Sequence, residues 1–196
     1  RSPLRVIDGY CKVLSEDYSD ILKQDALDAL QTIIRTTHRM DLLINELLQL
    51  ARLSHEKIQK TDVNMKEIAA DLVTQITEAK SYREHKVDIG DLPSCAADPA
   101  LIRQVWQNLI ENAFKFSSHQ PEKQIQIGCN EEAWEYIYFV KDNGVGLPKE
   151  SLEHIFEPFR RFHKSSEFEG TGIGLAIVKK IILNHNGRVW AESAPG

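Results

Sequence analysis

The sequence predicts an α+β protein: a helical hairpin that forms a dimeric four-helix bundle, followed by a two-layer α/β sandwich. Three observations lead to this prediction. Residues 25–53 contain no Gly or Pro and repeat apolar residues in steps of three and four. Residues 54–61 are a polar interruption. After it, shorter segments alternate between helical and strand patterns, which favours helices on one face of a mixed sheet.

Residues 1–54 are predicted to be a dimerisation hairpin. A long helix at 25–53 and an amphipathic helix at 4–14 are joined by a turn at 15–24. The apolar stripe of the long helix is wider than a two-stranded seam needs, so two helices cannot bury it alone. We therefore expect a second copy to complete the bundle, although an intramolecular bundle with upstream helices is an alternative.

Residues 55–61 are expected to be a linker, and residues 62–196 a second domain. Its predicted helices are 65–80, 99–116 and 171–184, with a short helix or two within 149–162, and its predicted strands are 86–89, 94–97, 124–129, 136–141 and 187–193. Asp98-Pro99 supplies an N-cap and a first-turn proline for the second of these helices. Strands 124–129 and 136–141 should pair antiparallel through a loop at 130–134.

The composition excludes several classes of function. With a net charge of −5, the chain has no general attraction for nucleic acid or anionic membranes, and we expect neither as a direct partner. Three widely spaced cysteines predict neither a disulfide framework nor a zinc site. No apolar run approaches the ~20 residues of a membrane span. These features predict a cytoplasmic location for this chain, whether its parent is soluble or membrane-anchored.

One polar helix face carries the first chemical signal. Asn108, Asn112 and Lys115 lie at i, i+4 and i+7, so two amides and an ammonium project from one side of the helix at 99–116. Asparagine is a poor former of helix interiors, so its presence twice needs a reason. An amide oxygen is a suitable Mg²⁺ ligand, and a nearby lysine can reach phosphates. A solvated helix face is the alternative.

Two glycine-rich loops carry the second signal. In "DNGVG", Asp142 ends a strand and can accept a hydrogen bond from the exocyclic amine of adenine, where guanine presents an acceptor instead. In "EGTGIGLAIVKKII", Gly170, Gly172 and Gly174 open a helix whose N-terminus suits phosphate. Each loop alone could be a common turn. In this order with the amide and lysine helix, they supply sites for adenine, triphosphate and Mg²⁺.

These motifs resemble those of the sensor histidine kinases of two-component systems, whose catalytic domain has the Bergerat-type ATP-binding fold shared with DNA gyrase and MutL. "NLIENAFKFS" resembles the N box, "DNGVG" the G1 box, "IFEPFRRF" the F box and "GTGIGLAIVKKI" the G2 box. The resemblance covers nearly the whole chain, and it implies that the hairpin at 1–54 is the dimerisation and histidine-phosphotransfer domain and that 62–196 is the ATP-binding catalytic domain. The segments "EFEGTGIGLAIVKKII" and "GRVWAES" are most similar to kinases attached to phytochrome or PAS sensors.

The resemblance implies a role for each motif residue. Asn112 would hold Mg²⁺, Asp142 would bind adenine, and Lys115 and Arg161 would act catalytically on the phosphates of ATP. The implied nucleotide site comprises Asn108, Asn112, Lys115, Phe116, Asp142, Gly144, Gly146, Arg161, Gly170, Thr171, Gly172, Ile173, Gly174 and Leu175. Residues 163–169, "HKSSEFE", would be a mobile lid over the nucleotide.

The first residues resemble the end of the family's H box. Ser2-Pro3 match its last two positions, which would place the acceptor histidine three residues before Arg1. His38 lacks the acid and the proline that accompany the acceptor. We therefore expect this chain alone to bind ATP without autophosphorylating. Ser2, one helical turn after the acceptor, could orient a water that dephosphorylates the partner regulator. The end at Gly196 would likewise cut off a last strand.

The predicted function is an ATP-dependent protein histidine kinase core, which phosphorylates a histidine just upstream and passes the group to an aspartate of a response-regulator receiver domain. One alternative is a Bergerat-type ATPase or conformational clamp. Another is a nonenzymatic nucleotide-binding dimerisation module. The bundle helices favour the kinase over the clamp. So does Asn108, because the Bergerat ATPases carry a glutamate base at this position. The complete set of motifs argues against the nonenzymatic module.

Overall fold

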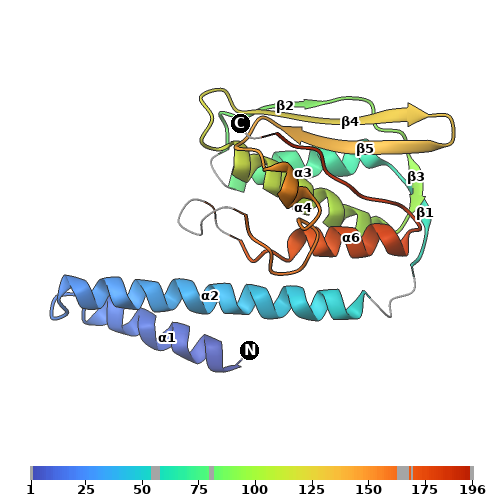
Figure 1. Ribbon diagram of the computed structural model, residues 1–196. Coiled ribbons are helices and arrows are strands. Elements are labelled where there is room, and N and C mark those ends of the chain that lie inside the picture. Colours follow the sequence, from blue (N-terminus) through green and yellow to red (C-terminus); the bar gives the residue numbers. More distant parts are fainter. Residues whose placement is uncertain (1, 54–57, 80–81, 163–167, 169, 195–196) are drawn as a thin grey trace. The chain divides into compact units, whose positions relative to one another are not determined.

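The computed structural model describes residues 2–53, 58–79, 82–162, 168 and 170–194 (Figure 1). The chain divides into two compact units, residues 1–51 and residues 52–196, and each is described by itself. Within the described residues, no helix combines the length and the apolar character needed to cross a membrane.

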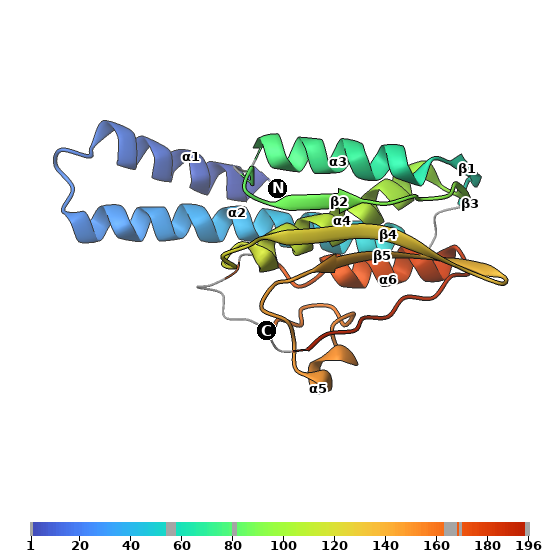
Figure 2. The same ribbon diagram turned by 90° about the horizontal axis from the view of Figure 1, so that it is seen from above.

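The first unit is a helical hairpin. Helices α1 (Ser2–Asp17) and α2 (Gln24–Arg52) run side by side and are joined by a short turn (Figures 1 and 2). The two helices are linked by Asp8, whose carboxylate lies 2.9 Å from Nε2 of His38 and 3.0 Å from Nζ of Lys12. His38 is more than half exposed. The hairpin predicted from the sequence is therefore present, with α1 longer than expected at both ends.

Large apolar side chains line the outside of this hairpin. Those with 40% or more of their surface exposed include Val6, Ile7, Tyr10, Val13, Leu14, Ile33, Met40, Leu47 and Leu48. They continue the wide apolar stripe that the sequence shows. Burial of a large apolar side chain stabilises by about 1.5–3 kcal/mol, so one hairpin leaves a substantial hydrophobic contribution unrealised.

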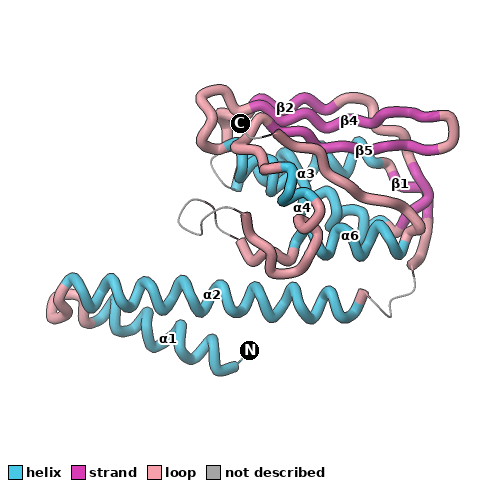
Figure 3. The backbone as a smooth tube through the Cα atoms, in the orientation of Figure 1, coloured by secondary structure: helices cyan, strands magenta, loops and turns pink. Residues whose placement is uncertain are grey.

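The second unit has two layers (Figures 1 and 3). Its main sheet has the strand order β2-β4-β5, with β2 parallel to β4 and β4 antiparallel to β5. The strands are β2 (Lys86–Ile89), β4 (Gln124–Glu132) and β5 (Glu135–Asp142), and helices α3 (Met65–Ala79), α4 (Pro99–Ser117) and α6 (Gly174–Asn184) cover one face. This arrangement confirms the predicted fold class.

Helix α4 is the centre of the core. It packs against α3, α6, β4 and β5. Ile110 and Phe114 of α4 are fully buried, and Ile125 and Ile127 of β4 are buried on the helical side of the sheet. The alternation of β4 thus places its isoleucines inward, as expected for a strand with one covered face.

The predicted N-cap of α4 is confirmed. The Asp98 carboxylate accepts from the backbone N–H groups of Ala100 and Leu101 at 3.1 and 3.2 Å, and Pro99 occupies the first turn. These bonds satisfy donors that a helix start otherwise leaves unpaired. Side-chain capping therefore fixes where α4 begins.

Asp98 also belongs to a group of contacts that we call the linker clamp: Leu53, Gln59, Asp98, Asn184 and His185. The Asp98 carboxylate accepts from Gln59 N–H at 3.1 Å, and Asp98 N–H donates to Nε2 of His185 at 3.0 Å. Asn184 Nδ2 donates to the carbonyl oxygen of buried Leu53 at 2.6 Å. The described ends of the linker are thereby fixed to the start of α4 and the end of α6.

The β4–β5 hairpin differs from its predicted form. The sequence predicts a loop at 130–134, whereas Glu132 pairs with Glu135 and only Ala133 and Trp134 form the turn. Polar residues 130–132 remain in the ladder because backbone pairing with β5, rather than side-chain propensity, decides their conformation. A short antiparallel pair, β1 (Thr61–Val63) with β3 (Cys95–Ala97), also lies where a linker end and a single strand were expected.

The predicted strand at 187–193 is wrong: these described residues form no strand. Side chains hold this segment instead, since Arg188 pairs with Glu135 and the Ser193 hydroxyl accepts from Leu147 N–H at 2.9 Å. Burial alternates along the segment, with Val189, Ala191 and Ser193 partly buried and Arg188, Trp190 and Glu192 exposed, but these described residues form no strand ladder.

The sequence predicts a short helix or two within 149–162, and one short helix, α5 (Lys149–Leu152), is present. The residues after it include Pro158 and a positive φ of 65° at Phe159, which do not continue a helix. The helix predicted at 171–184 begins only at Gly174, because Gly172 has a φ of 80°, which no helical residue adopts.

Candidate nucleotide-binding site

The polar face of α4 brings together the side chains that the spacing predicts. Asn108 Nδ2 donates to the Gln104 carbonyl oxygen at 2.9 Å. Its Oδ1 atom approaches the start of α6, since a Cβ built on Gly174 would lie 2.5 Å from it. One turn further, Lys115 Nζ donates to Oδ1 of Asn112 at 3.4 Å. Two amides and an ammonium therefore share one side of α4.

Lys115 connects this face to the loop that precedes α6. A Cβ on Gly170 would lie 3.3 Å from Nζ of Lys115. The same ammonium lies 4.2 Å from the centroid of the Phe116 ring, within the range of a cation–π interaction. Positive charge, an amide oxygen and a glycine-rich backbone are thus close enough to contact one phosphate chain.

The loop after β5 is joined to the C-terminal turn of α4. Asp142 Oδ1 accepts from Gly144 N–H at 2.9 Å, and Val145 N–H donates to the Phe116 carbonyl oxygen at 3.3 Å. Gly144 is buried, and a Cβ there would lie 2.5 Å from that carbonyl oxygen. The close approach of these two backbones requires glycine.

The Asp142 carboxyl has an altered electrostatic environment. The residue keeps contact with solvent, but the surrounding protein desolvates its carboxyl and raises its pKa above the ordinary value. The hydrogen bond from Gly144 N–H opposes this shift without cancelling it. A partly desolvated carboxylate forms stronger hydrogen bonds with a donor than a fully hydrated one.

The loop before α6 has the backbone geometry predicted for a phosphate-binding turn. Gly172 adopts a φ of 80°, and a Cβ there would lie 2.7 Å from the Arg160 carbonyl oxygen. Its own carbonyl oxygen accepts from Phe159 N–H at 2.9 Å. Fully buried Ile173 then anchors the start of α6. The unpaired N–H groups of that helix start are suited to an anion.

Arg161 contacts a residue whose importance the sequence did not indicate. Its Nη2 atom donates to the Phe168 carbonyl oxygen at 2.8 Å. Phe168 is buried, and its ring lies 5.2 Å from that of Phe116 and 5.0 Å from that of His119. The predicted lid at 163–169 otherwise lies outside the described residues. Phe168 is an aromatic residue in an otherwise polar stretch, and this was the signal from which its burial could have been predicted.

Asn143 is a second residue that sequence reasoning missed. Its Oδ1 accepts from Gln124 N–H at 2.9 Å, and its Nδ2 donates to the Glu122 carbonyl oxygen at 2.6 Å. These bonds fasten the Asp142 loop to the start of β4. Asparagine directly after a strand was a signal for such a turn.

The remaining predicted residues fall into two groups. Gly146, which has a φ of 62°, lies in the loop after β5, and Thr171 and Leu175 lie beside the glycine turn at α6. Ser2 begins α1 in the other unit, and its side chain lies outside the described residues. The structure therefore gathers the nucleotide-site residues within one unit, without Ser2.

The residues around Asn112 fit a magnesium ion that is held mainly by nucleotide phosphates and water. Among the described residues, no group of three or more His, Cys, Asp or Glu side chains could form a metal cage. Asn112 instead offers a half-buried amide oxygen beside the Lys115 ammonium. Mg²⁺ commonly takes few protein ligands and completes its shell with water and phosphate oxygens, so this donor suits a nucleotide-bound ion.

Two family models match the chain. The model described as "Histidine kinase-, DNA gyrase B-, and HSP90-like ATPase" matches residues 97–196. The model described as "His Kinase A (phospho-acceptor) domain" matches residues 1–56. The first match contains the site described above, and the second contains the helical hairpin.

Individual proteins agree with these matches. The chain is 34% identical over its whole length to the phytochrome-like protein Cph1 of Synechocystis sp., covering 26% of that protein. It is 32% identical over its whole length to the sensor protein kinase WalK of Staphylococcus aureus, covering 48% of that sequence. The chain spans about a quarter of the length of the first-ranked curated relatives.

Solved structures show the same fold. Full-length ShkA, in complex with AMPPNP, matches the whole chain with a TM-score of 0.71 at 21% identity, over 41% of its own length. The catalytic domain of the histidine kinase ThkA matches 67% of the chain with a TM-score of 0.56 at 26% identity, over 86% of its own length. The chain therefore belongs to the histidine kinase-, DNA gyrase B- and HSP90-like ATPase family, and its first 56 residues match the phospho-acceptor domain of histidine kinases.

Proposed function

We propose that this chain is the ATP-dependent catalytic core of a protein histidine kinase. The complete kinase would phosphorylate one of its own histidines and pass the phosphoryl group to an aspartate of a response-regulator receiver domain. One observation carries the proposal. The amide and lysine face of α4, the Asp142 loop and the glycine turn before α6 meet at one place. They do so in a chain that also matches a phospho-acceptor domain.

Each part of the site has a distinct task in ATP binding. Asp142 accepts a hydrogen bond from the adenine amine, and the Phe116 ring flanks the nucleotide. Lys115 and Arg161 stabilise negative charge on the phosphates, and Asn112 supplies an oxygen to Mg²⁺. The metal ion, when bound, neutralises charge on the phosphate oxygens. Asn108 holds its amide between α4 and the start of α6, beside the phosphates.

An ATPase or clamp is supported less well. Asn108 stands where the related ATPases carry a glutamate, and an amide cannot accept a proton from water. Its Nδ2 group already donates to Gln104 of the preceding turn. A site built in this way can position phosphates for transfer to a protein acceptor without efficiently activating a water.

The proposed function is tested by nucleotide binding and by phosphoryl transfer. In calorimetry, the chain should bind ATP in the presence of Mg²⁺, and GTP about a hundredfold more weakly, because the guanine acceptor would face the Asp142 carboxylate without a hydrogen. Chelation of Mg²⁺ should weaken ATP binding. The parent protein should incorporate γ-phosphate in an acid-labile, base-stable form. Equal affinity for ATP and GTP would contradict the proposed site.

We also propose that α1 and α2 form a homodimer through their exposed apolar side chains. Replacing both Ile33 and Met40, which lie two turns apart on α2 and are 44% and 47% exposed, by Glu should convert the dimer to a monomer. The reason is that charges buried at a helix interface lose hydration without gaining a partner.

Sedimentation at micromolar concentrations measures this change. Gln31→Glu, which places one charge on an exposed polar position of the same helix, is the matched control and should remain dimeric. A wild-type chain that sediments as a monomer throughout the concentration series would refute the dimer.

A further inference from the structure

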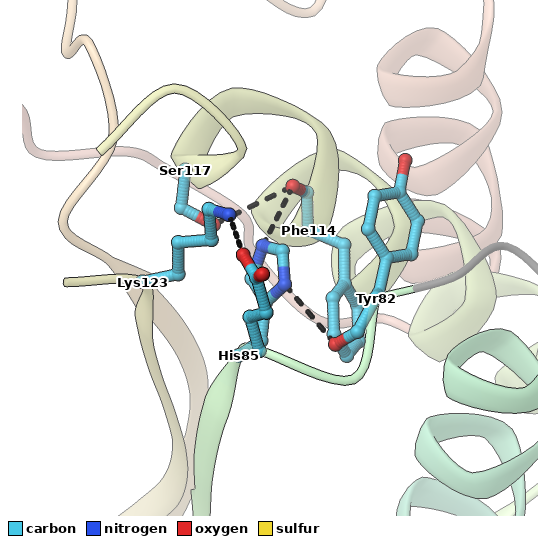
Figure 4. Close-up of polar contacts among 6 residues, drawn as sticks. Tyr82, His85, Phe114, Ser117 and Lys123 are labelled. Carbon is cyan, nitrogen blue, oxygen red and sulfur yellow. Dashed lines mark hydrogen bonds and ion pairs between the residues drawn. The ribbon is translucent and has the colours of Figure 1, made fainter. Parts of the chain in front are cut away.

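A histidine outside the nucleotide motifs lies against the end of α4 (Figure 4). His85, in the segment before β2, packs its ring edge-on to Tyr82 at 5.1 Å and at a tilt to Phe114 at 4.9 Å. The rings of Tyr82 and Phe114 stack on each other at 5.1 Å. Three rings from two parts of the chain thus form one aromatic cluster beneath the last turn of α4.

Both ring nitrogens of His85 face carbonyl oxygens. Nε2 lies 3.2 Å from the Phe114 carbonyl oxygen, and Nδ1 lies 3.2 Å from the Tyr82 carbonyl oxygen. A neutral imidazole carries a single N–H, so it can donate to only one of the two at a time. The tautomer with hydrogen on Nε2 donates to α4.

This contact completes the C-terminus of α4. The last four carbonyl groups of a helix have no partner within it. In α4 the partners are His85 Nε2 for Phe114, Ser118 N–H and Oγ–H for Lys115, Val145 N–H for Phe116, and Gln120 N–H for Ser117. Among the described residues, the Ser117 hydroxyl also approaches the Phe114 carbonyl oxygen, at a longer 3.5 Å. His85 is therefore the principal cap of this carbonyl.

We propose that His85 is a positioning residue for nucleotide binding: by capping Phe114 it holds the last turn of α4, which presents Lys115 and Phe116 to the nucleotide. The inference rests on the proposed ATP site and extends it to a side chain that does not touch ATP. Phe114 directly precedes these two residues, and the Phe116 carbonyl is bonded to the Asp142 loop. Loss of the cap would loosen both sides of the site.

The charge of His85 adds a dependence on pH. Burial opposes a positive ring and lowers the pKa of His85, while the Tyr82 and Phe114 carbonyl groups favour the charged form. Lys123 lowers the pKa further, and Glu84, which pairs with Lys123, raises it. Because the folded pKa lies below the unfolded one, the stabilisation is present above the ordinary histidine pKa and is lost as pH falls through the folded value.

Two substitutions in the full chain separate capping from charge. His85→Gln keeps an amide donor that cannot titrate, and His85→Leu removes the donor. At about pH 8, His85→Gln should bind Mg²⁺-ATP as the wild type does, and His85→Leu should bind about three- to tenfold more weakly, as expected for one lost hydrogen bond. His38→Gln, which removes an exposed histidine in the other unit, should bind Mg²⁺-ATP with the wild-type affinity.

A pH series tests the charge. Between about pH 8 and about pH 5.5, the unfolding free energy of the wild type should fall more steeply than that of His85→Gln, because protonating His85 costs more free energy in the folded chain than in the unfolded chain. Superimposable profiles for these two proteins would overturn the proposal, as would wild-type binding by His85→Leu.

A measurement without nucleotide tests the role of His85 separately from the proposed function. Amide hydrogen exchange at Ser118, Gln120 and Val145 should be faster in His85→Leu than in the wild type and His85→Gln. If the wild type bound no ATP at any pH, the proposed function would fail, while unchanged exchange in His85→Leu would independently refute the role of His85.

Discussion

Asp142→Asn is expected to weaken ATP binding about 3- to 12-fold while leaving the fold intact, because a charged hydrogen-bond acceptor contributes about 1.5–3 kcal/mol and a neutral one about half of that. The Asn oxygen can still accept from Gly144 N–H, so the loop keeps its internal bond. Calorimetry with Mg²⁺-ATP measures the loss.

The same substitution should not reduce stability. Burial raises the pKa of Asp142, so ionising its carboxyl costs more free energy in the folded chain than in the unfolded chain. The protonated Asp142 carboxyl therefore stabilises the fold below the pKa that it has in the unfolded chain, and this stabilisation is lost as pH rises through the pKa of the folded chain. Asn removes this cost, so the unfolding free energy at neutral pH should equal or exceed that of the wild type, and the difference should vanish in acid.

Urea unfolding followed by tryptophan fluorescence suits this measurement, because all three tryptophans, Trp106, Trp134 and Trp190, belong to the second unit. Asp88→Asn, an exposed carboxylate on β2, is the matched control and should change neither affinity nor stability. Undiminished ATP binding by Asp142→Asn would exclude the adenine contact.

Gly144→Ala is expected to lose both ATP binding and stability. The added Cβ would lie 2.5 Å from the carbonyl oxygen and 2.6 Å from the carbonyl carbon of Phe116, and backbone atoms at a helix end cannot rotate away. Overpacking at a buried position costs about 1–3 kcal/mol, and here it also separates the Asp142 loop from α4. We therefore expect a lower urea midpoint together with undetectable nucleotide binding.

Gly90→Ala is the control for this change, since its Cβ would meet its nearest neighbour, the Ile127 carbonyl oxygen, at an ordinary 3.6 Å. It should unfold within about 1 kcal/mol of the wild type and bind ATP normally. If Gly144→Ala matched Gly90→Ala in both measurements, the loop and α4 would not be coupled as described.

The parts of the fold that the sequence predicts are those with local causes. Helix α4 starts at Asp98-Pro99 because capping and proline geometry act within one turn. Asn108, Asn112 and Lys115 share a face because the helical period places them there. The glycine turn follows from residues that alone tolerate its backbone angles.

The missed features depend on partners that are distant in sequence. Strand β1 exists only through its pairing with β3, more than thirty positions away along the chain. At 187–193 burial alternates as it does in a strand, yet side-chain contacts rather than ladder bonds decide the conformation. Phe168 and His85 matter because of the rings and carbonyl groups they meet, which no local pattern records.

The linker clamp has a mechanical consequence. Residues Leu53 and Gln59 are fixed at the N-terminal end of α4 and the C-terminal end of α6, whereas Lys115 and the Asp142 loop lie at the opposite end of α4. A helix of 19 residues is a strut about 28 Å long, and its close-packed surroundings resist compression. Force applied to the linker would therefore displace α4 together with the elements packed around it, rather than bend the helix between its Asp98 end and the Asp142 loop.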